Sequence, residues 1–216
     1  MQRLFSFLGD LRNNNNREWF NQNKPLYSEL RELWLADLQR LIDIMAVEHD
    51  DLRGIRANDC AYRIYRDIRF KADKTPYKNY FSACLGPQGR KTMQSCFYLH
   101  FEPDSAGIYF GIWCPEPQKL RAIRALIDAE GDELQSAIDA PEFASRFKFM
   151  PFETLKKAPT GFPTDHPHID LLRAKDFTFG KNVPNSYFTE GDWVQRAARD
   201  FSHTHQVKRF LNYVFE

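Results

Sequence analysis

The chain has 216 residues, with 30 lysines and arginines against 29 aspartates and glutamates and a formal net charge of +1. This balance argues against binding nucleic acid or a membrane surface through overall charge, so any basic surface must be local. Hydrophobic residues make up 43% of the sequence and aromatic residues 15%, which argues against a disordered chain. The length fits one domain, and we predict a single domain over residues 1–216.

The N-terminal stretch and the cysteines favour a soluble, cytoplasmic protein. Residues 1–10 hold too short an apolar run for a signal peptide, and no stretch approaches the ~18 apolar residues of a membrane-spanning helix. The four cysteines, Cys60, Cys84, Cys96 and Cys114, show no C-x-x-C spacing, and three lie inside apolar runs. We therefore expect reduced core cysteines in a reducing cytoplasm.

The first quarter of the chain has helical periodicity. Apolar residues over 4–11 predict a short helix, which the asparagine run 13–16 ends. Asn15 as the N-cap of the next helix would place Glu18 at the third helical position, as in a capping box. Apolar residues then recur every three or four positions over 25–45, which predicts one long amphipathic helix.

The middle of the chain changes to a period of two, which predicts strands separated by clusters of Gly, Pro, Asp and Lys. Short connections between these strands imply antiparallel neighbours. One more strand is expected near the C-terminal end. The predicted strands cover residues 61–70, 80–85, 95–101, 108–114 and 176–181.

Helical periodicity returns at Pro117 and predicts a helix that Gly131 stops, with a further helical piece behind it. A final helix, capped by Thr189 or Asp192, is expected to run to about Val214. We therefore predict an α+β fold. It consists of an antiparallel sheet of about four to five strands, with long N-terminal, middle and C-terminal helices packed mainly on one face.

The stretch over residues 63–78, which we call the basic block, carries six cations and two carboxylates. If it is a strand, Arg66 falls on the side that also carries Ile64, Ile68 and Phe70. An unpaired guanidinium cannot be buried there, so Arg66 must be paired or lie at the mouth of a cavity. Two interpretations follow: an anion site, or an internal salt-bridge network that joins neighbouring elements.

As an anion site, the basic block would hold a phosphate- or carboxylate-type group with its cations. The expected ligand-binding residues are Arg63, Arg66, Arg69, Lys74 and Lys78. Asp67 would hold Arg66 or Arg69 in place, Tyr77 would contribute a hydroxyl, and His166 is the only reasonable acid or base. These three are the catalytic candidates, and the pattern leaves open whether the protein is an enzyme.

The alternative function is a binding module without chemistry. Here the cations of the basic block, together with Tyr65, Phe70 and Tyr77, would contact single-stranded nucleic acid or an acidic protein partner. Basic residues interleaved with aromatic ones suit single strands, because bases stack on the aromatic rings. The near-neutral net charge weakens this interpretation. The sequence does not indicate an oligomeric state.

A metal site and a cofactor site both lack a convincing pattern. His166 and His168, with Asp165 and Asp170, are ligand types that suit zinc. Their tight spacing would place the two histidines on opposite sides of an extended chain, so we predict no metal site. P-loop, dinucleotide-binding and nucleophile-elbow motifs are absent from the sequence, and we expect no cofactor.

Four stretches of the sequence carry a family resemblance: 14–20, the basic block 63–78, 111–117 and 159–175. They follow one another in the same order over most of the chain, and the part of the basic block from Arg66 to Lys78 is the most specific. On these residues the sequence resembles a widespread family of bacterial and fungal proteins catalogued as domain of unknown function 2461. The resemblance implies a single domain over the whole chain and supplies no activity.

Overall fold

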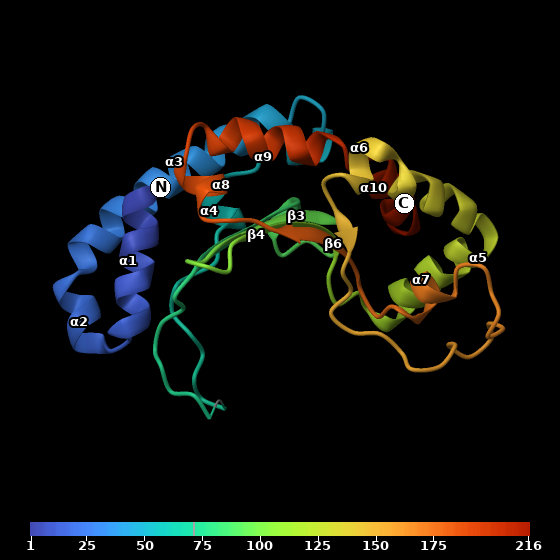
Figure 1. Ribbon diagram of the computed structural model, residues 1–216, viewed down its shortest axis with the longest axis horizontal. Coiled ribbons are helices and arrows are strands. Elements are labelled where there is room, and N and C mark those ends of the chain that lie inside the picture. Colours follow the sequence, from blue (N-terminus) through green and yellow to red (C-terminus); the bar gives the residue numbers. More distant parts are fainter. Residues whose placement is uncertain (71) are drawn as a thin grey trace. The chain divides into compact units, whose positions relative to one another are not determined.

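A computed structural model describes residues 1–70 and 72–216 of the protein (Figure 1). The described residues form an α+β fold with a five-stranded antiparallel sheet in the order β1-β3-β4-β6-β5. The predicted fold class is confirmed. The strands are β1 (Phe81–Leu85), β2 (Pro87–Arg90), β3 (Cys96–Phe101), β4 (Gly107–Ile112), β5 (Lys148–Phe149) and β6 (Phe177–Asn182).

Helices account for about half of the residues. The α-helices are α1 (Gln2–Asn13), α2 (Arg17–Gln22), α3 (Lys24–Met45), α4 (Ala57–Cys60), α5 (Pro117–Asp139), α6 (Pro141–Ala144), α7 (Ile169–Arg173), α8 (Ser186–Thr189), α9 (Trp193–Ser202) and α10 (His205–Asn212). Two 3-10 turns are η1 (Asp50–Leu52) and η2 (Tyr213–Phe215). The long helix predicted over 25–45 is confirmed as α3. Among the described helices, none combines the length and the hydropathy that crossing a membrane would require.

One of the predicted strands is wrong. Residues 61–70 form no strand, although Ala61 and Tyr65 make isolated antiparallel bridges to Ala83 and Tyr77. Phe70, expected on the apolar side of this strand, is 94% exposed. The other four predicted strands are confirmed as β1, β3, β4 and β6.

Two helix boundaries also differ from the prediction. Helix α5 continues through Gly131, and the break appears as a kink at Glu130, where φ is −131° and ψ is 26°. The predicted C-terminal helix is two helices, α9 and α10. Between them the Thr204 hydroxyl donates to the Phe201 carbonyl oxygen at 2.7 Å. This local hydrogen bond competes with continuation of the helix.

The chain divides into two compact units. Unit 1 comprises Met1–Lys91, Tyr98–Ile108 and Asn182–Arg199, and unit 2 comprises Thr92–Phe97, Tyr109–Lys181 and Asp200–Glu216. The family resemblance implies one domain, and the single-domain organisation stays a prediction.

The core of unit 1 is built on one face of β3. The Phe101 ring lies 4.2 Å from that of Phe188 in α8, 5.3 Å from Trp193 in α9 and 5.7 Å from Trp34 in α3, measured between ring centroids. Because side chains alternate along a strand, Tyr98 and His100 lie on the other face of β3, where they are half-buried. Helices therefore cover one face of β3, and polar aromatic residues line the other.

The core of unit 2 is rich in phenylalanine. Phe97 and Phe201 have ring centroids 5.0 Å apart, and Phe143 packs edge-on against Phe179 at 5.4 Å. The cysteines do not all belong to the two cores. Cys60 and Cys84 are buried, whereas Cys114 is exposed at a backbone φ of +49°, so the expectation of a core cysteine is wrong there.

Candidate anion site

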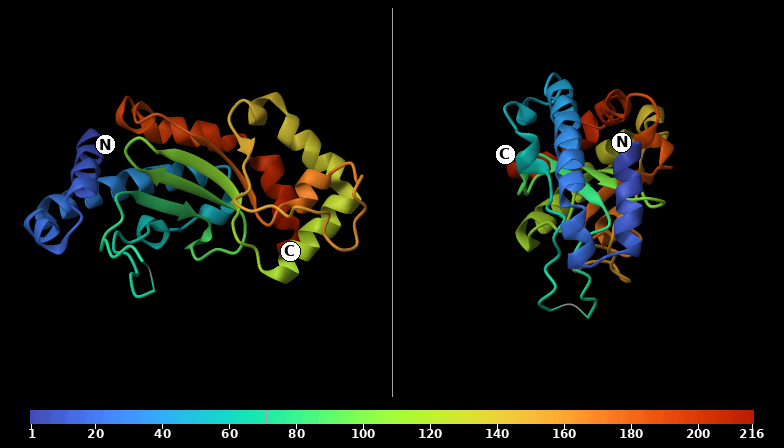
Figure 2. Two further views of the ribbon diagram at one scale, coloured as in Figure 1. Left: turned by 60° about the horizontal axis from the view of Figure 1, so that its bottom comes forward. Right: turned by 90° about the vertical axis from the view of Figure 1, so that its left-hand side faces the viewer.

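The basic block forms a long loop with a hydrogen-bonded base in unit 1. The Arg66 backbone N–H donates to the Pro76 carbonyl oxygen at 2.9 Å, and the Lys78 N–H donates to the Ile64 carbonyl oxygen at 2.8 Å. From this base the two arms of the loop extend away from the helices of unit 1 (Figure 2). The block therefore has a fixed base, near Lys78, and an outer part.

The start of α2 holds the base of the loop in place. The Asn15 side chain donates to the Tyr77 carbonyl oxygen at 2.9 Å and accepts from the Tyr77 N–H at 3.1 Å. The Tyr77 ring stacks on Phe20 with centroids 3.9 Å apart. Asn15 is therefore not the N-cap of α2, contrary to the prediction, and Asn16 caps the helix by accepting from the Trp19 N–H. Asn15 and Phe20 thus position Tyr77 and, with it, Lys78.

In the outer loop, Arg66 is paired. Its Nη1 lies 2.6 Å from the Asp73 carboxylate and also donates to the Thr75 hydroxyl oxygen. The Thr75 backbone N–H, the Arg66 guanidinium and the Thr75 hydroxyl together lower the pKa of the Asp73 carboxyl from 3.8 to about 2. Pairing is one of the two alternatives expected for Arg66, and Arg66 also lines a cavity described below.

The Asp73 pKa gives the loop a defined pH dependence. Because the folded pKa lies below the ordinary value, the order that Asp73 gives the loop is present above pH 4 or so and is lost as the pH falls towards 2. Titration of the side-chain carboxyl by ¹³C NMR should show a midpoint about 2. Arg66→Gln should move this midpoint towards the ordinary value, whereas Lys24→Gln should not. A wild-type midpoint near 4 would contradict the prediction.

Two other predicted ligand-binding cations also take part in local interactions. The Arg69 guanidinium pairs with the Asp67 carboxylate at 2.7 Å, so Asp67 holds Arg69 in place. The Lys74 Nζ donates to the Ile68 carbonyl oxygen at 3.0 Å. Lys71, a further cation of the block, lies outside the described residues. The salt-bridge interpretation therefore describes the outer loop well, and these exposed pairs contribute little to stability.

A cavity of about 570 Å³, which we call the tyrosine cavity, lies beside the base of the loop. Its walls come from α3, α4, the segment after α4, the base of the loop and β2. They carry three phenols and four cations, and no lining residue is a carboxylate. These residues are Tyr27, Tyr62, Tyr65, Arg31, Arg63, Lys78 and Arg90.

Helix α4 fixes two of these cations. The Arg90 Nη1 donates to the carbonyl oxygens of Asn58 at 3.1 Å and Asp59 at 2.9 Å. The Arg31 Nη2 donates to the Asn58 side-chain oxygen at 2.9 Å, and its Nη1 lies 3.5 Å from the exposed Glu32 carboxylate. Neutral oxygens thus orient both guanidinium groups, and the Glu32 carboxylate partly compensates the positive charge of Arg31.

Lys78 is a half-buried cation of the tyrosine cavity. Its Nζ lies over the rings of Tyr62 and Tyr80, at 5.4 Å and 5.5 Å from the centroids. Burial lowers the pKa of the Lys78 ammonium, and the positive charge of Arg63 lowers it further. Both effects disfavour the charged form, and a bound anion would offset both.

A second cavity of about 560 Å³, the loop cavity, shares Lys78 with the first and brings Arg66, Asp67 and Tyr77 together. Its charges are mixed. Arg66 pairs with Asp73, and Arg12, which also lines the cavity, lies 3.4 Å from the Asp104 carboxylate. The loop cavity therefore has little uncompensated positive charge to hold an anion.

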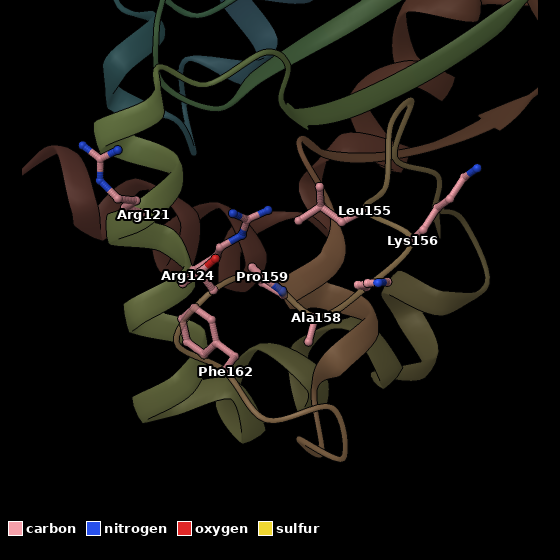
Figure 3. Close-up of a pocket in the computed structure, with 9 residues that line it drawn as sticks. Arg121, Arg124, Leu155, Lys156, Ala158, Pro159 and Phe162 are labelled. Carbon is pink, nitrogen blue, oxygen red and sulfur yellow. The ribbon is translucent and has the colours of Figure 1, made fainter.

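A third cavity, of about 600 Å³, lies in unit 2 between α5 and the loop before α7 (Figure 3). It is lined by arginines and lysines, but Figure 3 shows the side chains of Arg121 and Lys156 pointing away from each other. The Arg124 guanidinium donates to the carbonyl oxygens of Leu172 and Ala174, at 2.8 Å and 2.9 Å. The cations of this cavity do not converge on one point, so it is a weaker candidate for an anion site than the tyrosine cavity.

His166 belongs to unit 2 and lines neither the tyrosine cavity nor the loop cavity. Its Nε2 lies 3.1 Å from the Asp128 carboxylate, and its Nδ1 accepts from the His168 N–H at 3.0 Å. His168 in turn lies 3.0 Å from Asp132. A catalytic role for His166 stays a prediction. In residues 1–70 and 72–216, no group of three or more His, Cys, Asp or Glu side chains is placed to hold a metal ion.

Sequence reasoning located only part of the tyrosine cavity. It named Arg63, Tyr65 and Lys78, but not Tyr27 and Arg31 of α3 or Arg90 of β2. Tyr27 and Arg31 follow an ordinary amphipathic helix pattern, and Arg90 lies in a stretch whose Pro87 and Gly89 resemble a turn, so nothing in the sequence marks them as site residues. Tyr27, Arg31 and Arg90 reach the basic block only because α3, α4 and β2 pack together. No local pattern in the sequence predicts this packing.

The comparisons with known proteins bear on the whole chain. The family of conserved hypothetical proteins DUF2461 matches residues 3–210, a range that includes every residue lining the three cavities. No curated protein and no solved structure matches the chain. The resemblance noted in the sequence is thereby confirmed, and the chain belongs to the DUF2461 family of conserved hypothetical proteins.

Proposed function

We propose that the protein binds a small anionic molecule, with a phosphate- or carboxylate-type group, in the tyrosine cavity. The observation that carries the proposal is Lys78. Its ammonium is half-buried between two tyrosine rings beside Arg63, and no carboxylate lines the cavity. Gathering like charges is unfavourable, and an anion between Lys78 and Arg63 would offset the repulsion that the Arg63 charge exerts on the Lys78 ammonium.

The tyrosines of the cavity suit the remainder of such a ligand. Burial is the main cause that raises the pKa of the Tyr27 phenol, so this hydroxyl stays protonated and can donate a hydrogen bond to an anion. Tyr62 and Tyr65 add ring surface for an apolar or flat part of the molecule. In this proposal the cations bind the anionic group, and the tyrosine rings determine which apolar or flat part of the ligand fits beside it.

A binding module for single-stranded nucleic acid or an acidic protein has less support. Of the three aromatic residues that it would use, Tyr65 and Phe70 are exposed, but Tyr77 is buried and stacks on Phe20. Three rings in a row along the basic block are therefore not presented for base stacking. Labelled single-stranded DNA at two salt concentrations tests this alternative, because phosphate contacts make affinity depend on salt.

Calorimetric titration with inorganic phosphate at low salt tests the proposal. Lys78→Gln should weaken phosphate binding by about tenfold or more, because a hydrogen bond to a charged group contributes ~1.5–3 kcal/mol. Lys24→Gln is the matched control: it removes the same charge from an exposed position of unit 1 that lines none of the three cavities. Absence of phosphate binding by the wild type, or equal weakening in both variants, would contradict the proposal.

A further inference from the structure

Lys78 is held differently from Lys74, its neighbour in the basic block. Lys74 is exposed, and its Nζ donates to the Ile68 carbonyl oxygen. Lys78 is half-buried and lines the tyrosine cavity, where its Nζ lies against the ring faces of Tyr62 and Tyr80. A ring face attracts a cation, but it is not a hydrogen-bond acceptor of the strength of a carbonyl oxygen or a carboxylate. The cavity wall therefore positions the Lys78 nitrogen and leaves it accessible to a bound ligand.

The surroundings of Lys78 favour the neutral amine, which is the nucleophilic form of a lysine. Burial is the main cause that lowers the pKa of the Lys78 ammonium, and the positive charge of Arg63 lowers it further. Burial beside a second cation is one of the arrangements by which proteins activate a lysine for attack on a carbonyl group. The position of Lys78 in a cavity thus combines an accessible amine with surroundings that make it reactive.

We propose that Lys78 forms a reversible Schiff base with a carbonyl group of the anionic molecule bound in the tyrosine cavity, an inference that rests on the proposed function. The neutral amine attacks the carbonyl carbon and forms a carbon–nitrogen bond. The carbonyl oxygen leaves as water, with one proton from the amine and one from the solvent, and a protonated imine remains. No electron is gained or lost, and hydrolysis reverses each step.

The cavity defines the class of ligand. In the proposed complex the anionic group lies between Lys78 and Arg63, so a carbonyl carbon that reaches the Lys78 Nζ must be close to that group. A 2-oxo acid or a short aldehyde acid has this arrangement. The protonated imine carries the same charge as the ammonium, and it can therefore still pair with the anionic group and with the faces of Tyr62 and Tyr80. In this scheme Lys78 is the catalytic residue, and Arg63 binds the anion.

Reductive trapping with glyoxylate tests the inference. Glyoxylate carries a carboxylate next to an aldehyde, and sodium cyanoborohydride reduces its imine to a stable secondary amine. Mass spectrometry of the peptides then gives the labelling rate of each lysine. Lys78 should be labelled about tenfold or more faster than the exposed Lys24, the internal standard, because binding places the aldehyde beside the amine. Inorganic phosphate should slow the labelling of Lys78 and leave that of Lys24 unchanged.

A neutral aldehyde and two arginine variants are the controls. Acetaldehyde has no anionic group and should lose most of the preference for Lys78. Arg63→Gln should slow the labelling of Lys78 by glyoxylate by about tenfold, because it removes both a partner of the anion and a charge that lowers the Lys78 pKa. Arg53→Gln removes an exposed cation of unit 1 that lines none of the three cavities, and it should leave the labelling unchanged. Circular dichroism checks that both variants are folded.

Three outcomes would overturn the inference: a Lys78 rate no higher than that of Lys24, equal selectivity of acetaldehyde and glyoxylate for Lys78, or equal slowing in the two arginine variants. Calorimetry with phosphate separates this test from that of the proposed function. Phosphate binding without rapid labelling of Lys78 leaves the anion site and removes the Schiff base. Rapid labelling that phosphate does not slow, with no phosphate binding in calorimetry, shows a reactive lysine without an anion site, and the proposed function fails together with the inference.

Discussion

Gly111→Ala should lower the free energy of unfolding by roughly 3 kcal/mol or more, the sum of a strained backbone and an overpacked contact. Gly111 lies in β4 with a φ of +129°, a region that favours glycine. A Cβ at this position would collide with the Phe177 carbonyl oxygen on the neighbouring strand β6. The backbone of a paired strand cannot move aside as a flexible side chain can. The backbone strain and the steric collision therefore both lower the stability of the variant.

Urea-induced unfolding followed by circular dichroism measures this loss, and two glycines serve as controls. Gly9→Ala, inside α1 with open space around it, should raise stability by about 0.5–1 kcal/mol because alanine favours helix. Gly161→Ala has a φ of +95° and open space, so it isolates the conformational cost alone. A Gly111→Ala protein as stable as Gly161→Ala would show that the predicted collision is relieved.

The sequence predicted those parts of the fold in which local pattern and tertiary packing agree. Strand β3 alternates in sequence and buries alternate residues, and Phe101 meets three helices on its buried side. Residues 61–70 also alternate, apart from Arg66 on the apolar side, yet this stretch pairs mainly with the far end of its own loop and leaves Phe70 in solvent. Strand β2 was missed because Pro87 and Gly89 resemble a turn. An alternating sequence pattern alone does not predict which segment an extended stretch pairs with.

Local sequence pattern also predicts only part of the candidate site. The Asp67–Arg69 salt bridge joins residues two apart and the Arg66–Asp73 salt bridge joins residues seven apart, so the salt-bridge interpretation could be reached from sequence. The tyrosine cavity instead joins residues from Tyr27 to Arg90, whose approach depends on packing. Its charge imbalance is a property of the assembled unit. In the sequence, the near-equal numbers of cations and anions conceal it.

Phe20→Ala should be the most damaging single change in the helices around the tyrosine cavity, with a loss of about 3–5 kcal/mol in the free energy of unfolding. The Phe20 side chain is 1% exposed. Its ring contacts those of Tyr27, Tyr65 and Tyr77, at centroid distances of 5.1 Å, 5.9 Å and 3.9 Å. The substitution leaves a cavity beneath all three tyrosines at once, and the neighbouring backbone cannot collapse fully into it.

The damage should also reach the candidate anion site, because Tyr27 and Tyr65 line the tyrosine cavity and Tyr77 precedes Lys78. We expect faster amide hydrogen exchange at Arg66 and Lys78, whose N–H groups close the base of the loop, and weaker phosphate binding by the folded fraction.

Phe70→Ala is the matched control for Phe20→Ala. It removes the same side chain from the basic block itself, at a position that is 94% exposed, and should change the free energy of unfolding by less than about 0.5 kcal/mol. Urea unfolding and hydrogen exchange of the two variants show whether Phe20 helps to hold the base of the loop or whether Asn15 holds it alone. If Phe20→Ala loses stability while exchange at Lys78 stays as slow as in the wild type, Asn15 alone holds the base of the loop through its two bonds to Tyr77.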